Sequence, residues 1–323
     1  MKVVFSELYK THNPPFFHHV ENSDRLEKAL SSLHDVEIVE PSSPANPEEI
    51  HDRDYVELVR RFSAREEPLD QDTYTNKYTY EVARLALGGA MKAYQVQGIA
   101  LVRPPGHHAG KYGRAMGAPT QGFCIFNNIA YVANKIREKI AIVDFDVHHG
   151  NGTQELFYSD PRVLHIDIHQ DPTTLYPGTG FPFQVGEREG AGYKLNFVLP
   201  PGAGDDTIEE LIPVVQSILD QFNPDVLAFS AGFDAFEGDG LASIRLSEFS
   251  FELLGSLGKG RKWFATLEGG YNVGIERGLP AFIRGLELNL TYPKPNVSDD
   301  SVMSRFMDEL KQTKLYLNQF WRL

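Results

Sequence analysis

Short apolar runs of strand length alternate with helical patterns along most of the chain, and this alternation limits the fold more than any other feature. The candidate strands are 3–5, 36–39, 99–102, 140–145, 163–168, 195–199, 226–230 and 263–267. Helical patterns lie between them, at 79–97, 127–137, 207–222, 246–257 and 275–290. Strands buried on both faces read as continuous apolar runs, and intervening helices connect parallel strands. The sequence therefore predicts an α/β fold with a mostly parallel central sheet flanked by helices on both faces.

The domain organisation is simple, because no linker rich in proline, glycine or serine divides the 323 residues. We expect one domain over residues 1–323, with a last helix at about 298–320 packed on it. No stretch approaches the roughly 20 apolar residues of a membrane span, and the start lacks the apolar region of a signal peptide. The single cysteine, Cys124, excludes an intrachain disulfide and fits a cytoplasmic protein. We interpret Cys124 as a small core residue.

The chain is acidic, with 44 acidic and 31 basic residues and a formal net charge of -13. This charge argues against direct nucleic-acid binding, which needs a basic surface to displace counterions. It is compatible with a cationic substrate, although simple solubility explains it equally well. We therefore expect neither a nucleic-acid nor a membrane partner.

Polar and ionisable residues follow four of the expected strands directly. The segments are RPPGHH at 103–108, DVHHGN at 146–151, AGFD at 231–234 and EGGY at 268–271. Six of the 11 histidines also lie between positions 107 and 169, closer together than scattered structural histidines would be. In open parallel sheets, ligands bind at the carboxyl ends of the strands. The sequence therefore predicts a functional site at this edge of the sheet.

Asp146 and His148 have the spacing and the side-chain types of metal ligands. Residues two apart at a strand end point to the same side, so this carboxylate and this imidazole can share one ion. Asp234, at another strand end, can supply a third ligand. Three such ligands without a thiolate leave one position for water, the open arrangement of a catalytic zinc site. Asp146 and His148 alone could merely bond neighbouring loops, but the complete set of residues favours the metal.

His107 and His108 form a tandem pair that proline and glycine hold in a tight loop. Two imidazoles can act as general base and general acid near neutral pH, and Asp144 and Asn151 are candidate partners that would set their tautomers. Tyr271 follows two glycines and can donate a hydrogen bond to an oxyanion. Taken singly, the histidines could be core residues and the tyrosine could be a packed loop residue.

Together these segments resemble the zinc-dependent histone deacetylase family, in its class II-like form, whose fold is shared with arginase. The resemblance runs from about His19 to about Gly285, and a motif at 19–25 is similar to the early histidine-to-arginine motif of that family. The matching segments are 103–109, 122–128, 143–157, 176–180, 230–239 and 267–272.

The resemblance implies a role for each matching position. Zinc ligands are implied at Asp146, His148 and Asp234. His108 is implied as the general base, with His107 assisting electrostatically or as a proton donor, and Tyr271 as the transition-state tyrosine. The substrate channel matches Gly122, Phe123, Tyr176 and Leu241. One potassium site matches oxygens of Asp144, Asp146, His148 and Asp167, and a second matches Phe157, Asp160, Val163 and Tyr193.

Five positions depart from the commonest pattern of the family. Asn151 stands where class I members carry aspartate, and Tyr176 stands where phenylalanine is commoner. Asp167 replaces a serine near the first potassium site, and Gly240 replaces a proline. Leu241 occupies the gatekeeper position, where polyamine-selective relatives can place a glutamate. Leucine there favours a lysine side chain or a longer acyl chain.

The resulting hypothesis is a zinc-dependent amidohydrolase that deacylates N-acyl-lysine side chains, or related acylated amines, by attack of a metal-bound water. Its partners would be acylated lysine peptides or proteins or a small acylated amine, and its cofactors one zinc ion and structural potassium. An acetylpolyamine deacetylase is the nearest alternative. An arginase-like dimanganese hydrolase is opposed because only one clear metal-type Asp-x-His cluster, that of Asp146 and His148, is offered, so a binuclear site lacks ligands. A non-catalytic acyl-lysine-binding protein is opposed by the complete set of candidate catalytic residues.

Overall fold

The architecture is described by a computed structural model that covers residues 1–15 and 18–323. Eight parallel strands form the central sheet, in the order β2-β1-β3-β10-β9-β6-β7-β8. Their bounds are β1 Lys2–Val4, β2 Glu37–Val39, β3 Ile99–Ala100, β6 Ile140–Asp144, β7 Val163–Gln170, β8 Lys194–Leu199, β9 Val226–Ala231 and β10 Trp263–Leu267. A small hairpin pairs β4 Ala109–Gly110 with β5 Gly113–Arg114. The predicted α/β class with a parallel sheet is confirmed.

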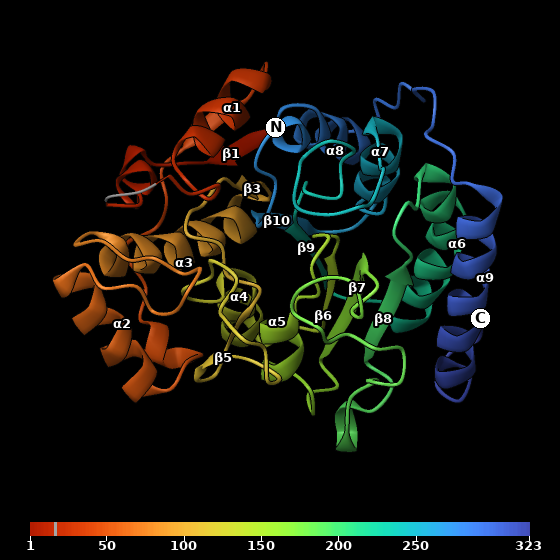
Figure 1. Ribbon diagram of the computed structural model, residues 1–323, viewed down its shortest axis with the longest axis horizontal. Coiled ribbons are helices and arrows are strands. Elements are labelled where there is room, and N and C mark those ends of the chain that lie inside the picture. Colours follow the sequence, from red (N-terminus) through yellow and green to blue (C-terminus); the bar gives the residue numbers. More distant parts are fainter. Residues whose placement is uncertain (16–17) are drawn as a thin grey trace.

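Helices cover both faces of the sheet, with α7 and α8 on one side and α3 and α4 on the other (Figure 1). The α-helices are α1 Asp24–Ser32, α2 Arg53–Arg65, α3 Thr79–Val96, α4 Asn128–Ile136, α5 Asn151–Leu156, α6 Asp205–Phe222, α7 Glu248–Ser256, α8 Leu279–Leu286 and α9 Asp300–Leu317. Short helical turns are η1 Glu7–Thr11, η2 Pro47–Glu49, η3 Arg188–Gly190 and η4 Gly274–Gly278.

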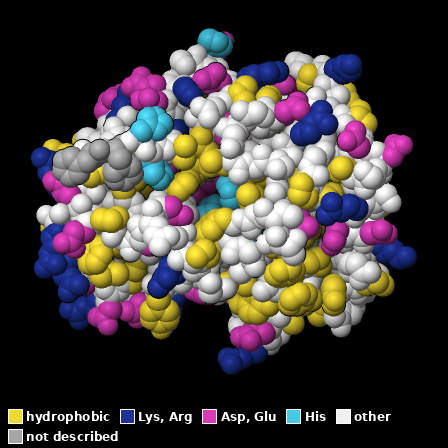
Figure 2. Space-filling view, in the orientation of Figure 1, with side chains coloured by type: hydrophobic (Ala, Val, Ile, Leu, Met, Phe, Trp, Pro, Cys, Tyr) yellow, Lys and Arg dark blue, Asp and Glu magenta, His cyan; other side chains and the backbone are white. Residues whose placement is uncertain are grey.

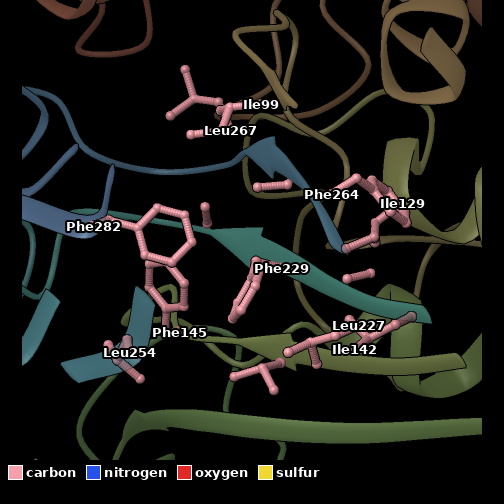
Figure 3. Packing of buried hydrophobic residues seen from close by; sticks show 14 of the residues in the cluster. Ile99, Ile129, Ile142, Phe145, Leu227, Phe229, Leu254, Phe264, Leu267 and Phe282 are labelled. Atoms are coloured by element: carbon pink, nitrogen blue, oxygen red, sulfur yellow. The ribbon is translucent and has the colours of Figure 1, made fainter. Parts of the chain in front are cut away.

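The core lies on both faces of the central strands, because every residue of β6 and β9 is buried. On one face, the ring of Phe282 in α8 lies 5.1 Å from the rings of both Phe145 and Phe229 (Figure 3). On the other face, α4, which carries the buried Ile129, packs against β9 and β10, and Ile129 lies close to Phe264 of β10 (Figure 3). This two-sided packing is why the strands read as continuous apolar runs. It also makes the sheet a rigid base for the loops at its carboxyl edge.

The last helix, α9, packs against β8, the strand at one end of the sheet. Its buried residues recur every three or four positions, at Phe306, Leu310, Thr313 and Leu317, as expected for one face of a helix. It begins two residues later and ends three residues earlier than the expected 298–320. Among the helices of the described residues, none combines the length and the apolar character that crossing a membrane would require.

Candidate active site

A pocket of about 220 Å³ opens at the carboxyl edge of the sheet. Figure 2 shows it as a hollow with histidine at its floor and hydrophobic side chains around its rim. The site residues expected from the sequence that line it are His107, His108, Gly122, Phe123, Asp146, His148, Tyr176, Leu241 and Tyr271. Asp144, Asn151 and Asp234 are buried in contact with these residues. The fold thus gathers residues from four strand ends around one cavity.

Asp146, His148 and Asp234 form one group, with buried carboxylates and a partly exposed imidazole, whose candidate ligand atoms all lie within 4.8 Å of one another. His148 Nδ1 is 3.0 Å from Asp146 Oδ1 and 3.2 Å from Asp234 Oδ2. Among the described residues, Asp234 Oδ2 has no hydrogen-bond partner of good geometry, although it is fully buried. A buried carboxylate oxygen is costly unless it is paired or binds a metal. The three residues therefore fit a divalent metal ion.

The glycine at position 269 leaves room for this group. A Cβ atom there would overlap the carboxylates of both Asp146 and Asp234. The backbone N–H of Gly269 instead donates to Asp146 Oδ2 at 2.7 Å. The EGGY segment therefore lies against the metal-type cluster of Asp146, His148 and Asp234 without occupying the space between these side chains.

The electrostatics of the cluster also favour a cation. Burial raises the pKa of Asp234 to about 6, and the nearby Asp146 carboxylate adds to this effect. Burial disfavours a charged His148, yet its contacts with Asp146 and Asp234 raise its pKa to about 9. A positive charge between the two carboxylates, whether a proton on His148 or a metal ion, therefore offsets their repulsion. Metal binding to such a set releases protons and should weaken as the pH falls.

The tandem histidines have different partners. His107 Nδ1 lies 2.9 Å from Asp144 Oδ2, whereas His108 Nδ1 lies 2.7 Å from Asn151 Oδ1. The Asn151 amide nitrogen donates to the Ala115 carbonyl at 2.9 Å, so its oxygen must face His108. His108 therefore carries its proton on Nδ1 and leaves Nε2 as a base.

The different partners of His107 and His108 also give the two rings different pKa values. Burial opposes a charged His107, but the Asp144 carboxylate outweighs it and holds the pKa of His107 well above its usual range. Burial, followed by the charges of His107 and His148, holds the pKa of His108 well below its usual range. One ring is thus suited to act as an acid and the other as a base.

Glu268 holds the loop that carries the tandem histidines, a role that the sequence did not reveal. Its Oε2 atom accepts from the backbone N–H groups of Gly106 at 2.8 Å and His107 at 3.1 Å. The side chain is fully buried, and the backbone N–H of Glu268 pairs with Ala231 of β9. The loop that carries the tandem histidines is therefore tied to the end of the sheet.

Tyr271 lies between the pocket and a buried arginine. The guanidinium carbon of Arg25 is 4.5 Å from the centre of the Tyr271 ring, and Arg25 Nε donates to the Gly270 carbonyl at 2.6 Å. The early motif at 19–25 thus supports the tyrosine from behind. Burial raises the pKa of Tyr271 well above its usual value, so the phenol stays protonated and can donate.

Aromatic rings form the walls of the pocket. Phe123 meets Tyr271 edge-on at 5.9 Å, and the Tyr176 hydroxyl donates to the Thr120 carbonyl at 2.9 Å. Gly122 has a φ of +53°, and a Cβ there would come 2.5 Å from Cδ2 of His108. Only glycine suits this turn. The wall residues named from the sequence therefore come together.

Two lining residues have positions that the sequence did not indicate. Asp72 lies in the pocket wall, where its carboxylate accepts from Thr120 Oγ1 at 2.7 Å. Cys124 is buried, as expected of a core residue, but it also lines the pocket, and its sulfur accepts from the His108 backbone N–H at 3.4 Å.

The residues expected at the first potassium site lie together. Asp144 and Asp167 are opposite each other in the β6–β7 ladder, and with His165 they form a buried group of candidate ligands. Neither ring nitrogen of His165 has a hydrogen-bond partner among the described residues. Two adjacent carboxylates repel each other in a dry interior, so this group fits a bound cation.

The residues expected at the second potassium site also gather, but they do not fit a free ion. The ammonium of Lys194 lies among the carbonyl groups of Asp160, Val163 and Tyr193. The expectation of a potassium ion at this set therefore conflicts with the structure, because a lysine of the chain itself fills the place.

The fold and the pocket together define a class: a parallel α/β protein with a buried metal-type ligand set at the carboxyl edge of its sheet. Within this class, the chain belongs to the histone deacetylase family, because residues 19–286 match the histone deacetylase domain. Membership of this family supports a hydrolase of the deacetylase type.

Individual relatives agree with this assignment. A probable deacetylase of Methanothermobacter thermautotrophicus is 40% identical over 315 residues, which covers 89% of this chain and 91% of that protein. Histone deacetylase 15 of Arabidopsis thaliana is 38% identical over 79% of this chain and 50% of its own. The crystal structure of the HDA15 HD domain is similar with a TM-score of 0.86 and 32% identity, covering 99% of this chain and 97% of that one.

Proposed function

We propose that the protein is a zinc-dependent amidohydrolase that removes acyl groups from lysine side chains or related amines. One observation carries the proposal: Asp146 and His148 of the three-residue metal-type cluster line the same pocket as the His108 imidazole and the Tyr271 phenol. Family membership supports the deacetylase reaction. It does not by itself select the metal or the amine.

Asp146, His148 and Asp234 would hold the metal. When bound, zinc acts as a Lewis acid toward the scissile carbonyl and makes water a better nucleophile at neutral pH. Zinc suits one nitrogen and two oxygen ligands with an open position. The absence of a thiolate among them agrees with a catalytic site.

The remaining groups move protons and hold the reacting atoms. His108 Nε2 takes a proton from the water that attacks the carbonyl carbon. Tyr271 donates a hydrogen bond to the carbonyl oxygen as negative charge develops there. His107, kept charged by Asp144, supplies positive charge or a proton as the C–N bond breaks. The products are a free amine and a carboxylate.

The shape of the pocket supports a narrow, mainly apolar side chain as the bound group. Phe123 and Tyr176 both line the pocket and would flank the methylene stem of a lysine, and Leu241 lies in the lining without adding charge. Such a channel excludes water and orients one amide bond. We propose acylated lysine as the substrate class.

An acetylpolyamine is the second candidate, because Asp72 also lies in the pocket lining. A carboxylate there can pair with a second ammonium of a polyamine, even though Leu241 is not acidic. It can equally accept from the backbone N–H groups of a peptide. Comparing kcat/KM for an acetyl-lysine peptide and acetylspermidine, with wild type and Asp72→Asn, separates the two. Selective loss of polyamine turnover in the variant would favour the polyamine.

The test of the reaction class is hydrolysis of a fluorogenic acetyl-lysine substrate by the purified protein. We expect a chelator to abolish activity and added zinc to restore it, with about one zinc per chain. Persistent activity without metal would contradict zinc dependence. A metal content near two per chain at full activity would instead favour an arginase-like centre.

Potassium belongs to the proposal at the first site only. Asp144 and Asp167, with oxygens of Asp146 and His148, would hold the ion beside the His107 partner. A cation there would offset the repulsion between the two carboxylates. It would thereby keep Asp144 ionised and in place to hold His107.

A further inference from the structure

Lys194 begins strand β8, and its side chain is completely buried. Its Nζ atom lies 2.6 Å from the carbonyl oxygen of Val163 and 3.2 Å from those of Asp160 and Tyr193. An ammonium has three protons to donate, so each has a backbone acceptor. Lysine is almost never fully buried without such partners.

These acceptors are the carbonyls that the family resemblance assigns to a second potassium ion. The fourth carbonyl of that set, on Phe157, accepts from the Asp160 backbone N–H at 2.9 Å. Within the described residues, every carbonyl of the set therefore has a donor from the chain itself. No carbonyl of the set is left without a partner for a metal ion to satisfy.

Burial opposes the positive charge of Lys194, whereas the three carbonyl groups around its Nζ atom favour it. Burial lowers the pKa of Lys194 to about 7, while the Asp160 carboxylate acts in the opposite direction. That carboxylate also pairs with Arg162, at 2.7 Å. A potassium ion and an ammonium group carry the same charge and have similar size, and both are stabilised by carbonyl oxygens. One group can therefore stand in for the other.

We propose that the Lys194 ammonium is a built-in replacement for the cation of this second site, so that this part of the fold is held without a bound ion. Asp160 lies in the connection from α5 to β7, and Val163 is the first residue of β7. Helix α5 begins at Asn151, which sets the tautomer of His108. The lysine thus secures, without potassium, an element that carries a residue of the site.

The first experiment counts rubidium ions, as a potassium analogue, bound to zinc-loaded protein at constant ionic strength with choline. Lys194→Ala removes the ammonium and opens its space, so we expect this variant to bind one more rubidium ion than wild type. Lys135→Ala, which removes the same charge at an exposed position, should bind the same number as wild type. Equal stoichiometry in wild type and Lys194→Ala would overturn the proposal.

Thermal unfolding gives a second readout that does not depend on activity. In choline chloride, Lys194→Ala should unfold about 5 °C or more below wild type, because three backbone carbonyls lose their donor. Potassium chloride should recover a clear part of that loss, beyond any shift that it causes in wild type. An identical deficit in both salts would contradict a vacated cation site.

Wild-type crystals soaked in rubidium decide the matter if the variant does not fold. We expect no anomalous peak among the carbonyls of Asp160, Val163 and Tyr193, with Lys194 in place. A peak at that position, with the lysine displaced, would overturn the proposal. Neither result depends on whether the protein is a deacetylase.

Discussion

The side-chain oxygen of Asn151 lies 2.7 Å from Nδ1 of His108, and this contact decides which nitrogen of the ring faces the pocket. An amide oxygen accepts but carries no full charge, so it orients the imidazole without stabilising the imidazolium strongly. The contrast with His107, whose partner is the Asp144 carboxylate, separates the pKa values of the two neighbouring rings. The proposed division of roles between base and acid rests on these partners.

Asn151→Asp should therefore move the acidic limb of the pH–rate profile to higher pH. The new carboxylate would stabilise charged His108 and raise its pKa, and a base must be neutral to accept a proton. A carboxylate at hydrogen-bond distance shifts such a pKa by about 1 to 3 units. The measurement is kcat/KM against pH, with Asn134→Asp on α4 as the control for an added charge elsewhere. An unmoved acidic limb would count against His108 as the base.

Tyr271→Phe should lower kcat about a hundredfold, equivalent to about 3 kcal/mol, because the oxyanion loses one donor. KM and zinc content should change little, since the ring still packs on Arg25 and Phe123. The exposed Tyr112→Phe is the matched control. Near-full activity of Tyr271→Phe would show that another donor holds the oxyanion.

Much of this site could be predicted from the positions at which the expected strands end in the sequence. Asp146, His148 and Asp234 were predicted as a group because continuous apolar runs end just before them, and parallel strands bring such ends to one edge. The order of strands in the sheet could not be predicted in this way. It places β3 beside β10 and β9 beside β6, and it depends on packing between segments far apart in the chain.

The residues that could not be predicted bond to partners that lie at no characteristic distance from them along the sequence. Lys194 reads as an ordinary polar residue at a strand boundary, and its burial depends on carbonyls from two other segments. Glu268 reads as one more acidic group at the edge, although it bonds the backbone of the histidine loop. Asp72 lies in a loop rich in acidic residues, so nothing distinguished it from a solvated side chain.

Removal of the metal should destabilise the wild-type protein. A ligand that binds only the folded state contributes about 4 kcal/mol when its free concentration is a thousandfold above Kd. Zinc removal should thus lower Tm by about 8 °C. Differential scanning calorimetry with chelator and with zinc measures the shift. Identical melting under both conditions would contradict a folded-state metal site.

Asp234→Asn should abolish the effect of zinc on Tm without lowering the Tm of the metal-free protein. Burial and the Asp146 carboxylate raise the pKa of Asp234 to about 6, so its ionised form destabilises the metal-free fold at neutral pH. The neutral amide removes this repulsion, worth roughly 1–3 kcal/mol. In chelator the variant should therefore melt at or above the wild-type temperature, yet gain nothing from zinc. A variant that melts far below wild type in chelator would show that Asp234 has a purely structural role.

His51 should make the stability of the fold depend on pH, independently of the active site. It is buried, its Nε2 accepts from the Asn127 backbone N–H at 2.9 Å, and its Nδ1 donates to the Gly110 carbonyl at 2.8 Å. Because an N–H group faces Nε2, a second ring proton has no acceptor. Burial accordingly lowers the pKa of His51 to about 4, although the bond to Gly110 acts against this.

The sign follows from proton uptake by the unfolded chain, where histidine has a pKa of about 6.5. Below that pH the unfolded state gains a proton that folded His51 does not accept, so stability falls as the pH falls toward 4. The loss between pH 7 and pH 5 should be about 2 kcal/mol from this residue.

Urea unfolding of His51→Gln in chelator should show lower stability at pH 7 but a flatter pH dependence than wild type. The exposed His34→Gln is the control and should keep the wild-type slope. If His51→Gln keeps that slope as well, the buried tautomer is not the origin of the acid sensitivity, and other buried histidines such as His12 must carry it.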